Sequence, residues 1–299
     1  MRSEPVPDNK VFHRGDLTFS ALDMGEGPVV LCLHGFPDNL GSFRHQQPAI
    51  AEAGYRVISL ALRGYEPSSI PADGDYTVES IAADIIGVID QLGSDKVHLV
   101  GHDWGAAVAY TAAAAAPERF ESLITMAVPH PGRFAREGLR IPKQLKNSWY
   151  MGFFNIPWLS DWVVARQDFA FIRKLWRDWS PCWTSDATAL DGVIDDLSQP
   201  GVLSATLGYY RAALSLQALT MSAEDAHYAV PVATLALTGE RDGCIDSRVF
   251  ERLMHPEDFP RGLKLERVTG AGHFLHQERP ELVNDLILKW LANRHALLG

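Results

Sequence analysis

Short apolar runs recur along the chain and are separated by stretches with helical spacing. The run at residues 29–33 contains no polar residue, which suits a strand buried on both faces of a parallel sheet. The run at residues 97–100 is apolar except for His98 and is followed by Gly101, and it predicts another strand of the sheet. Further strands are predicted at residues 56–61, 123–128, 234–238 and 265–268.

Helical spacing occupies the gaps between these strands. From residue 78 to residue 89 apolar side chains recur with the period of an amphipathic helix, and Thr77 is placed to cap its start. An early hairpin is predicted around residues 16–24, closed by the glycines within residues 25–27. The alternation of strand and helix predicts an α/β fold, with a mostly parallel central sheet flanked by helices on both faces. The other predicted helices cover residues 43–53, 104–116 and 280–291.

The pattern changes between residues 130 and 229, where strand-like runs of this quality are missing. The stretch has helical spacing and is rich in aromatic residues, including six tryptophans: Trp149, Trp158, Trp162, Trp176, Trp179 and Trp183. We therefore predict a core domain made of residues 1–129 and 230–299, with residues 130–229 inserted as a helical cap.

The chain carries 37 acidic and 27 basic side chains, a formal net charge of -10 at pH 7. This net negative charge disfavours electrostatic binding to nucleic acid or to anionic lipid. No apolar stretch approaches the roughly 20 residues that cross a bilayer, and the N-terminal residues do not resemble a signal peptide. We expect a cytoplasmic protein with neither nucleic acid nor membrane as a partner.

The three cysteines, Cys32, Cys182 and Cys244, are widely spaced and form no metal-like cluster. An odd number without a pairing pattern predicts free thiols in a reducing compartment. Cys32 lies inside an apolar run, so we expect it to pack in the core.

The sequence Gly101-His102-Asp103-Trp104-Gly105 follows an apolar strand and precedes a helix of small residues. Hydrolases with a serine nucleophile carry Gly-x-Ser-x-Gly at such a strand–turn–helix junction. The two glycines permit the tight turn, because side chains there would collide with the strand and helix that meet at it.

An aspartate at this position changes the chemistry. A carboxylate is ionised at neutral pH, and the helix N-terminus favours its charge. It can displace a leaving group at a saturated carbon and form an ester, which water must then hydrolyse. Epoxide opening and halide displacement both fit this scheme. The alternative interpretation is that Asp103 only caps the helix.

A base that activates water should come late in the chain. Residues 268–272 form a strand end and a glycine-rich loop, and His273 follows directly. We predict His273 as the base. The alternative, His276, lies further into the next segment and is expected to be a surface or helix-side histidine.

The acid that orients this histidine should follow the preceding strand. Asp242 lies in a tight turn there, with Asp246 as the alternative, while Glu240 is expected to be exposed or ion-paired. The other place for such an acid, after the strand before the insertion, holds no carboxylate at residues 128–131. This absence favours Asp242.

Hydrolysis of an Asp103 ester creates an oxyanion that needs backbone N–H donors. Trp104 directly follows the aspartate, and Phe36 is the second predicted donor, because Pro37 has no N–H. Three other histidines are expected to have local structural roles: His34, His102 and His130.

These motifs together resemble the epoxide hydrolases of the α/β-hydrolase fold, and the resemblance spans nearly the whole chain. It rests on residues 34–37, 101–105, 239–242 and 272–273. The resemblance implies two cap tyrosines that donate hydrogen bonds to the epoxide oxygen, and by similarity these are Tyr150 and Tyr210. It leaves open whether the neighbouring Tyr209 faces the site instead, or whether the tyrosines only pack the cap.

The resemblance implies a small apolar epoxide as substrate, a vicinal diol as product, and no metal or organic cofactor. Haloalkane dehalogenases are the nearest alternative, but they typically carry Asn where this chain has Phe36. Fluoroacetate dehalogenases typically carry arginines after the nucleophile, and none follows Trp104 closely. A catalytically silent binding protein would not need the complete set of Asp103, Asp242 and His273. The oligomeric state stays open, with a homodimer as one option.

Overall fold

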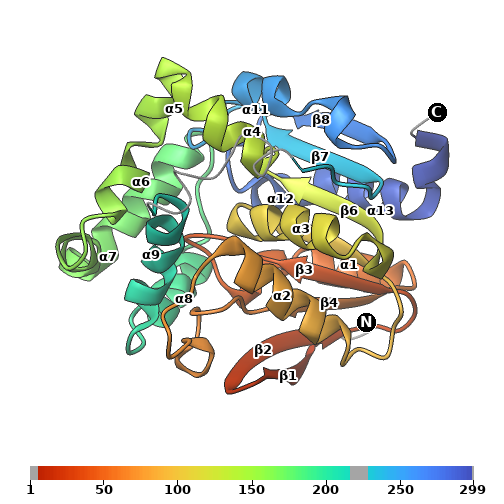
Figure 1. Ribbon diagram of the computed structural model, residues 1–299, viewed down its shortest axis with the longest axis horizontal. Helices are drawn as coiled ribbons and strands as arrows, with labels where there is room; N and C mark the ends of the chain where they lie inside the picture. Colours follow the sequence, from red (N-terminus) through yellow and green to blue (C-terminus); the bar gives the residue numbers. More distant parts are fainter. Residues whose placement is uncertain (1–5, 216–227, 298–299) are drawn as a thin grey trace.

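A single twisted sheet runs through the computed structural model, which describes residues 6–215 and 228–297 (Figure 1). Within these residues eight strands lie in the order β1-β2-β4-β3-β5-β6-β7-β8. The first two strands pair antiparallel, β2 is antiparallel to β4, and all other neighbours are parallel. The strands are β1 (Asp8–Arg14), β2 (Leu17–Met24), β3 (Val29–Leu33), β4 (Arg56–Leu60), β5 (Val97–His102), β6 (Phe120–Met126), β7 (Thr234–Gly239) and β8 (Leu263–Val268).

Both faces of the central strands are buried, as the unbroken apolar run at residues 29–33 predicts. Successive side chains of a strand point to opposite faces. In β3, Leu31 and Leu33 join one core cluster, whereas Val30 and Cys32 join the other. The predicted packing role of Cys32 is therefore confirmed, and all three cysteines are free thiols, as expected.

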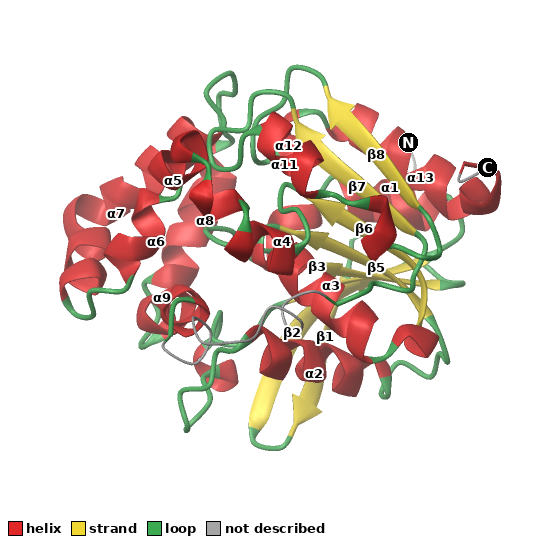
Figure 2. Cartoon of the chain, turned by 45° about the horizontal axis from the view of Figure 1, so that its top comes forward, coloured by secondary structure: helices red, strands yellow, loops and turns green. Residues whose placement is uncertain are grey.

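Helices cover both faces of the sheet (Figure 2). Ile81 and Ile85 of α2 pack in the first cluster, and Ile287 of α13 packs in the second. The Thr77 side chain accepts a hydrogen bond from the Ser80 N–H, so the predicted cap of α2 is confirmed. These helices are α1 (Gln46–Glu52), α2 (Val78–Ile89), α3 (Trp104–Ala115), α11 (Ser247–Leu253), α12 (Leu275–Glu278) and α13 (Pro280–Leu297). Short 3-10 helices are η1 (Leu40–Phe43), η2 (Pro67–Ser69), η3 (Pro117–Arg119), η4 (Gly138–Arg140) and η5 (Pro256–Asp258).

Between β6 and β7 the described residues form helices and no strand. Most of these helices gather at one end of the sheet (Figures 1 and 2). The longest, α7, is broken where Gln167, Asp168 and Phe169 adopt left-handed backbone angles. The helices are α4 (Pro131–Arg136), α5 (Pro142–Asn147), α6 (Trp149–Phe154), α7 (Leu159–Trp179), α8 (Ala187–Leu197) and α9 (Val202–Ala213).

The first hairpin differs from its prediction. Its turn lies at Gly15 and Asp16, between β1 and β2, and the glycines of residues 25–27 instead connect β2 to β3. The predicted helix at 43–53 is also shorter, because η1 precedes α1 and only α1 is α-helical. Among the described residues, no helix combines the length and the apolar character needed to cross a bilayer.

Candidate active site

Asp103 occupies a strained turn between the end of β5 and the start of α3. Its φ of 51° and ψ of -121° are unusual for a residue with a side chain. A Cβ on Gly101 would overlap the backbone of Gly105, and one on Gly105 would overlap the Leu33 carbonyl. The glycines therefore allow strand and helix to meet closely, as the spacing predicts.

The Asp103 carboxylate is turned away from the helix that it precedes. It makes no capping hydrogen bond, and its Oδ1 instead accepts from the Phe36 N–H at 2.7 Å. The loop after β3 lies directly against it, since a Cβ on Gly35 would come within 2.5 Å of the Asp103 Cβ and 2.6 Å of the Trp104 nitrogen. The helix-cap interpretation does not describe this side chain. The Phe36 N–H thus contacts the Asp103 carboxylate, and the oxyanion-stabilising roles of Phe36 and Trp104 stay predictions.

Asp242 and His273 meet Asp103 from the loops after β7 and β8. His273 Nδ1 lies 3.1 Å from Asp242 Oδ2, and its Nε2 lies 3.4 Å from Asp103 Oδ2. The other oxygen of Asp242 accepts from the N–H groups of Cys244 and Ile245 at 2.7 and 3.0 Å. The structure thus brings together the three residues that the sequence singled out, with the imidazole between two carboxylates.

The charge of this imidazole depends on both carboxylates. Burial disfavours the imidazolium, but Asp242 and Asp103 outweigh it and raise the pKa of His273 to about 10. At neutral pH the resting site therefore holds a protonated imidazole, whose charge stabilises the Asp103 carboxylate.

The alternative acids and base lie elsewhere. His276 lies in helix α12, as one of its two expected places has it, but it is buried rather than on the surface, and its Nε2 lies 2.9 Å from the Ser42 hydroxyl. Asp246 caps α11 and pairs with Lys143. Glu240 is exposed, as expected, and accepts from a backbone N–H.

His34, His102 and His130, the three histidines expected to have local structural roles, each form a hydrogen bond with the backbone. His34 accepts from the Leu62 N–H, and burial lowers its pKa to about 4. His102 bonds to the His273 carbonyl at 2.9 Å, and burial followed by the His273 charge lowers its pKa to about 3. His130 bonds to the Tyr228 carbonyl at 2.9 Å. Because His102 supports the loop of His273, it helps to position the imidazole.

Tyr150 of α6 and Tyr210 of α9 are both buried, with ring centroids 5.7 Å apart, and the Tyr210 ring lies 5.5 Å from that of Phe36 and 5.2 Å from that of Trp104. The hydroxyl of Tyr210 makes no hydrogen bond of good geometry among the described residues, although the Trp104 side chain lies close enough to oppose the rise of its pKa. Burial raises the pKa of both phenols well above the usual value, and the Asp103 charge adds to the shift. Both phenols are therefore protonated donors at neutral pH.

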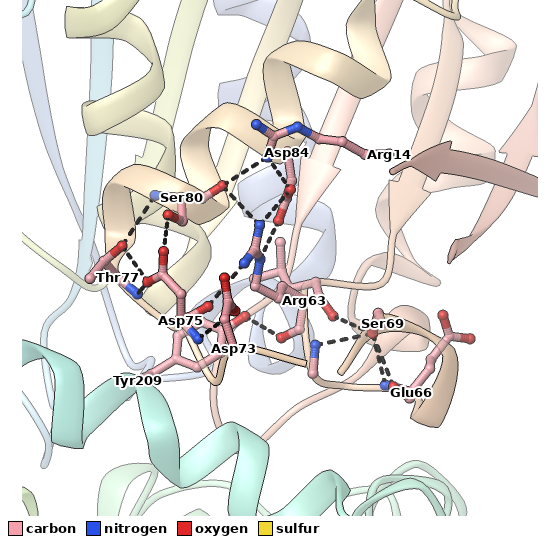
Figure 3. A network of polar contacts seen from close by, with 12 residues as sticks. Arg14, Arg63, Glu66, Ser69, Asp73, Asp75, Thr77, Ser80, Asp84 and Tyr209 are labelled. Carbon is pink, nitrogen blue, oxygen red and sulfur yellow. Dashed lines mark hydrogen bonds and ion pairs between the residues drawn. The ribbon is translucent and has the colours of Figure 1, made fainter. Parts of the chain in front are cut away.

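Tyr209, the neighbour of Tyr210 on α9, belongs to a polar network around Arg63 and Asp84 (Figure 3). Its hydroxyl donates to the Arg63 carbonyl at 2.6 Å. The Arg63 guanidinium in turn forms a two-point ion pair with Asp84, at 2.5 and 2.8 Å, and Arg14 also reaches Asp84. Tyr209 therefore anchors α9 to the loop of Arg63, and its neighbour Tyr210 stays the tyrosine predicted to face the site.

A contact that the sequence did not reveal joins α7 to both loops of the site. The Trp179 carbonyl accepts from the N–H of His273 at 3.1 Å and from that of Gly243 at 3.0 Å. Its indole packs on the His273 ring, with centroids 4.9 Å apart. Trp179 and Gly243 also line a cavity of about 440 Å³. No residue pattern could predict this contact, because any residue type offers a backbone carbonyl.

Two groups of buried side chains have a geometry suited to a metal ion: Asp242 with Cys244 and His273, and Asp38 with His102 and His276. In the first group Asp242 already accepts hydrogen bonds from both partners. In the second, Asp38 accepts from Ser42 and Gln277. Hydrogen bonds thus engage the carboxylate of each group, and the expectation that no metal is needed stays a prediction.

This sheet, with an aspartate in the turn after β5 and an aspartate and a histidine after β7 and β8, has the organisation of an α/β hydrolase. The chain belongs to the alpha/beta hydrolase fold family, which matches residues 28–280. The predicted fold class is confirmed.

Within this fold family, the chain is similar to several proteins named as epoxide hydrolases. The chain is 34% identical over 285 residues to epoxide hydrolase 4 of Homo sapiens, covering 92% of this chain and 76% of that protein. It is 32% identical to the AB hydrolase superfamily protein YfhM of Bacillus subtilis, over 93% of this chain and 95% of that protein. A solved epoxide hydrolase of Bacillus megaterium, in complex with an inhibitor, matches with a TM-score of 0.83 and 27% identity, covering 95% of this chain and 100% of its own. The predicted resemblance to epoxide hydrolases is therefore confirmed.

Proposed function

We propose that this protein is an epoxide hydrolase that converts a small apolar epoxide into a vicinal diol through an ester of Asp103. The observation that carries the proposal is the pair of buried tyrosine hydroxyls, those of Tyr150 and Tyr210, close to a carboxylate at the turn after β5. The names of the relatives, including epoxide hydrolase 4 of Homo sapiens, support the same reaction. Residues 130–229 act as the cap that supplies the tyrosines.

The first step is ring opening. Oδ1 of Asp103 accepts from the Phe36 N–H, so Oδ2, which lies 3.4 Å from the His273 imidazole, is the oxygen that attacks a ring carbon. The carbon–oxygen bond of the ring breaks, and the departing oxygen takes a proton from a phenol. Protonated Tyr150 and Tyr210 can both donate to this oxygen. The product is a hydroxyalkyl ester of Asp103, and solvent or His273 returns the proton to the phenolate.

The second step is ester hydrolysis. Esterification removes the negative charge of Asp103, which is one of the causes that raise the pKa of His273. The imidazole therefore loses its proton more readily and can act as the base for water, while Asp242 keeps its orientation. Water adds to the ester carbonyl, and the oxyanion forms at Oδ1, beside the Phe36 amide and the Trp104 N–H. When the tetrahedral intermediate breaks down, the departing alkyl oxygen takes the proton held by His273 and leaves as the diol, and the Asp103 carboxyl then passes its own proton to His273 and is restored as a carboxylate.

A single turnover in heavy-oxygen water tests the ester. With enzyme in excess over an aryl epoxide such as styrene oxide, the first diol should be unlabelled, and a peptide containing Asp103 should gain one heavy oxygen. Direct attack of water on the epoxide would place the label in the diol and leave Asp103 unlabelled. Halide release from haloalkanes faster than diol formation would instead support the dehalogenase alternative.

The phenols are tested by removing one hydroxyl at a time. Tyr150→Phe and Tyr210→Phe should each slow ester formation on the order of 100-fold, the usual effect of losing a general acid. Tyr209→Phe is the matched control, because it removes a neighbouring hydroxyl that bonds to the Arg63 carbonyl. Equal rates in all three variants would return the tyrosines to a packing role.

A further inference from the structure

Cys244 touches both parts of the site, yet neither proposed step uses it. It lies two residues after Asp242, and its backbone N–H donates to Asp242 Oδ1 at 2.7 Å. Its Sγ lies 3.2 Å from the hydroxyl of Tyr150, and the side chain is buried. One residue thus connects the loop of the orienting acid to a phenol of the helical segment.

The chemistry of the two groups decides which of them donates the hydrogen bond between Tyr150 and Cys244. Burial raises the pKa of the Tyr150 hydroxyl and of the Cys244 thiol well above their usual values, so both carry a proton at neutral pH. A phenol is a good donor, whereas a thiol is a weak donor and its sulfur a weak acceptor. Tyr150 therefore donates and Cys244 accepts. The Tyr210 hydroxyl, by contrast, has no such acceptor among the described residues.

We propose that Cys244 is a positioning residue that holds the hydroxyl of Tyr150 toward the site and releases it to the epoxide oxygen. This inference rests on the proposed function. A side chain without any acceptor would leave the phenol free to turn, and an oxygen acceptor would hold it more firmly. A sulfur acceptor orients the hydroxyl, and because the hydrogen bond to sulfur is weak, little free energy is lost when the hydroxyl turns to the epoxide oxygen. After release, the S–H group is free to donate to the phenolic oxygen.

A double-mutant cycle with Tyr150 separates positioning from packing. Rates of ester formation are measured by rapid quench in the wild type, Cys244→Ala, Tyr150→Phe and the double variant. We expect Cys244→Ala to slow ester formation about fivefold or more, the size of one lost hydrogen bond, and to leave ester hydrolysis unchanged. In the Tyr150→Phe background the same substitution should have no further effect, because the hydroxyl on which it acts is absent.

Two further variants complete the test. Cys244→Ser should restore part of the rate, because its hydroxyl again orients the phenol but releases it less readily. Cys32→Ala removes the same sulfur volume from the second core cluster and should leave ester formation at the wild-type rate. The infrared S–H band that disappears in Cys244→Ala should shift in Tyr150→Phe, and this measurement needs no turnover.

The outcomes are distinct. An equal slowing by Cys244→Ala in both backgrounds would show that the thiol acts on packing or on the substrate, and would overturn the inference. Wild-type rates in Cys244→Ala would also overturn it. Wild-type rates in Tyr150→Phe alone would remove Tyr150 from the proposed reaction, and the inference with it. If Tyr150→Phe is slow while Cys244→Ala is not, the proposed function stands and only the role of Cys244 is lost.

Discussion

Nε2 of His273 lies 3.4 Å from Oδ2 of Asp103, and the imidazole is fully buried. A charge interaction at this distance and depth is little screened by salt. The proton affinity of His273 therefore depends on whether Asp103 carries its charge. In the proposed reaction this coupling switches the role of His273. Forming the ester removes the Asp103 charge and lets the imidazolium become a base, and hydrolysing the ester restores both charges.

Asp103→Asn imitates the uncharged ester and should lower the pKa of His273 from its wild-type value of about 10. Asp242 remains in the variant and keeps part of the shift, so we expect a decrease of at least about one unit. NMR titration of the His273 imidazole measures it directly. Asp246→Asn removes a carboxylate that caps α11 and serves as the control. An unchanged value in Asp103→Asn would contradict the coupling.

The same pKa predicts how stability depends on pH. His273 has a folded pKa of about 10, above the value of about 6.5 for an unfolded histidine. Its stabilising contribution is complete below the unfolded value and is lost as the pH rises toward and through the folded one. Between these values the free energy of unfolding should fall by up to about 1.4 kcal/mol per pH unit from this group.

Urea unfolding of the wild type and His273→Gln across this range isolates the contribution of the histidine. The wild type should lose stability more steeply than the variant, because glutamine has no proton to retain. Parallel curves would show that the folded and unfolded histidines bind protons equally.

Much of the site could be predicted from the sequence because each part has a local signature. The turn that holds Asp103 needs glycines at two fixed positions, and Asp242 and His273 each follow a strand. Parallel strands bring their carboxyl ends to one edge of the sheet, so order along the chain becomes proximity in space.

Features of the structure that have no local sequence signature are either missed or predicted at the wrong position. The turn at Gly15 is not evident in the sequence because β1 is largely exposed and shows no clear apolar alternation. The burial of His276 is hidden as well, because a single histidine does not reveal the buried partners, such as Ser42, that reach it from far along the chain. The Trp179 carbonyl leaves no trace in the sequence at all.

The ion pair beneath Tyr209 should matter greatly for stability. The side chains of Asp84 and Arg63 are only 2% and 7% exposed. Asp84→Asn leaves the Arg63 charge buried without its counter-charge, and we expect a loss of about 3–5 kcal/mol in the free energy of unfolding. Asp90→Asn breaks an ion pair with Arg119 in which the carboxylate is 60% exposed, and should cost no more than about 1 kcal/mol. Similar urea midpoints for the two variants would show that the buried pair contributes little.

Two glycine-to-alanine substitutions should have opposite effects. A Cβ on Gly105 would overlap the backbone carbonyls of Leu33 and His34, which belong to the end of a central strand and cannot move aside cheaply. Gly105→Ala should therefore cost several kcal/mol of stability and abolish diol formation, since strain at such a site is among the large effects of single substitutions. Gly152 lies in α6, where an added Cβ would meet nothing within 4 Å. Alanine is the better helix former by about 0.5–1 kcal/mol, so Gly152→Ala should raise the urea midpoint and keep turnover. An active, stable Gly105→Ala variant would mean that the turn carrying Asp103 can open without losing the geometry on which the proposed attack depends.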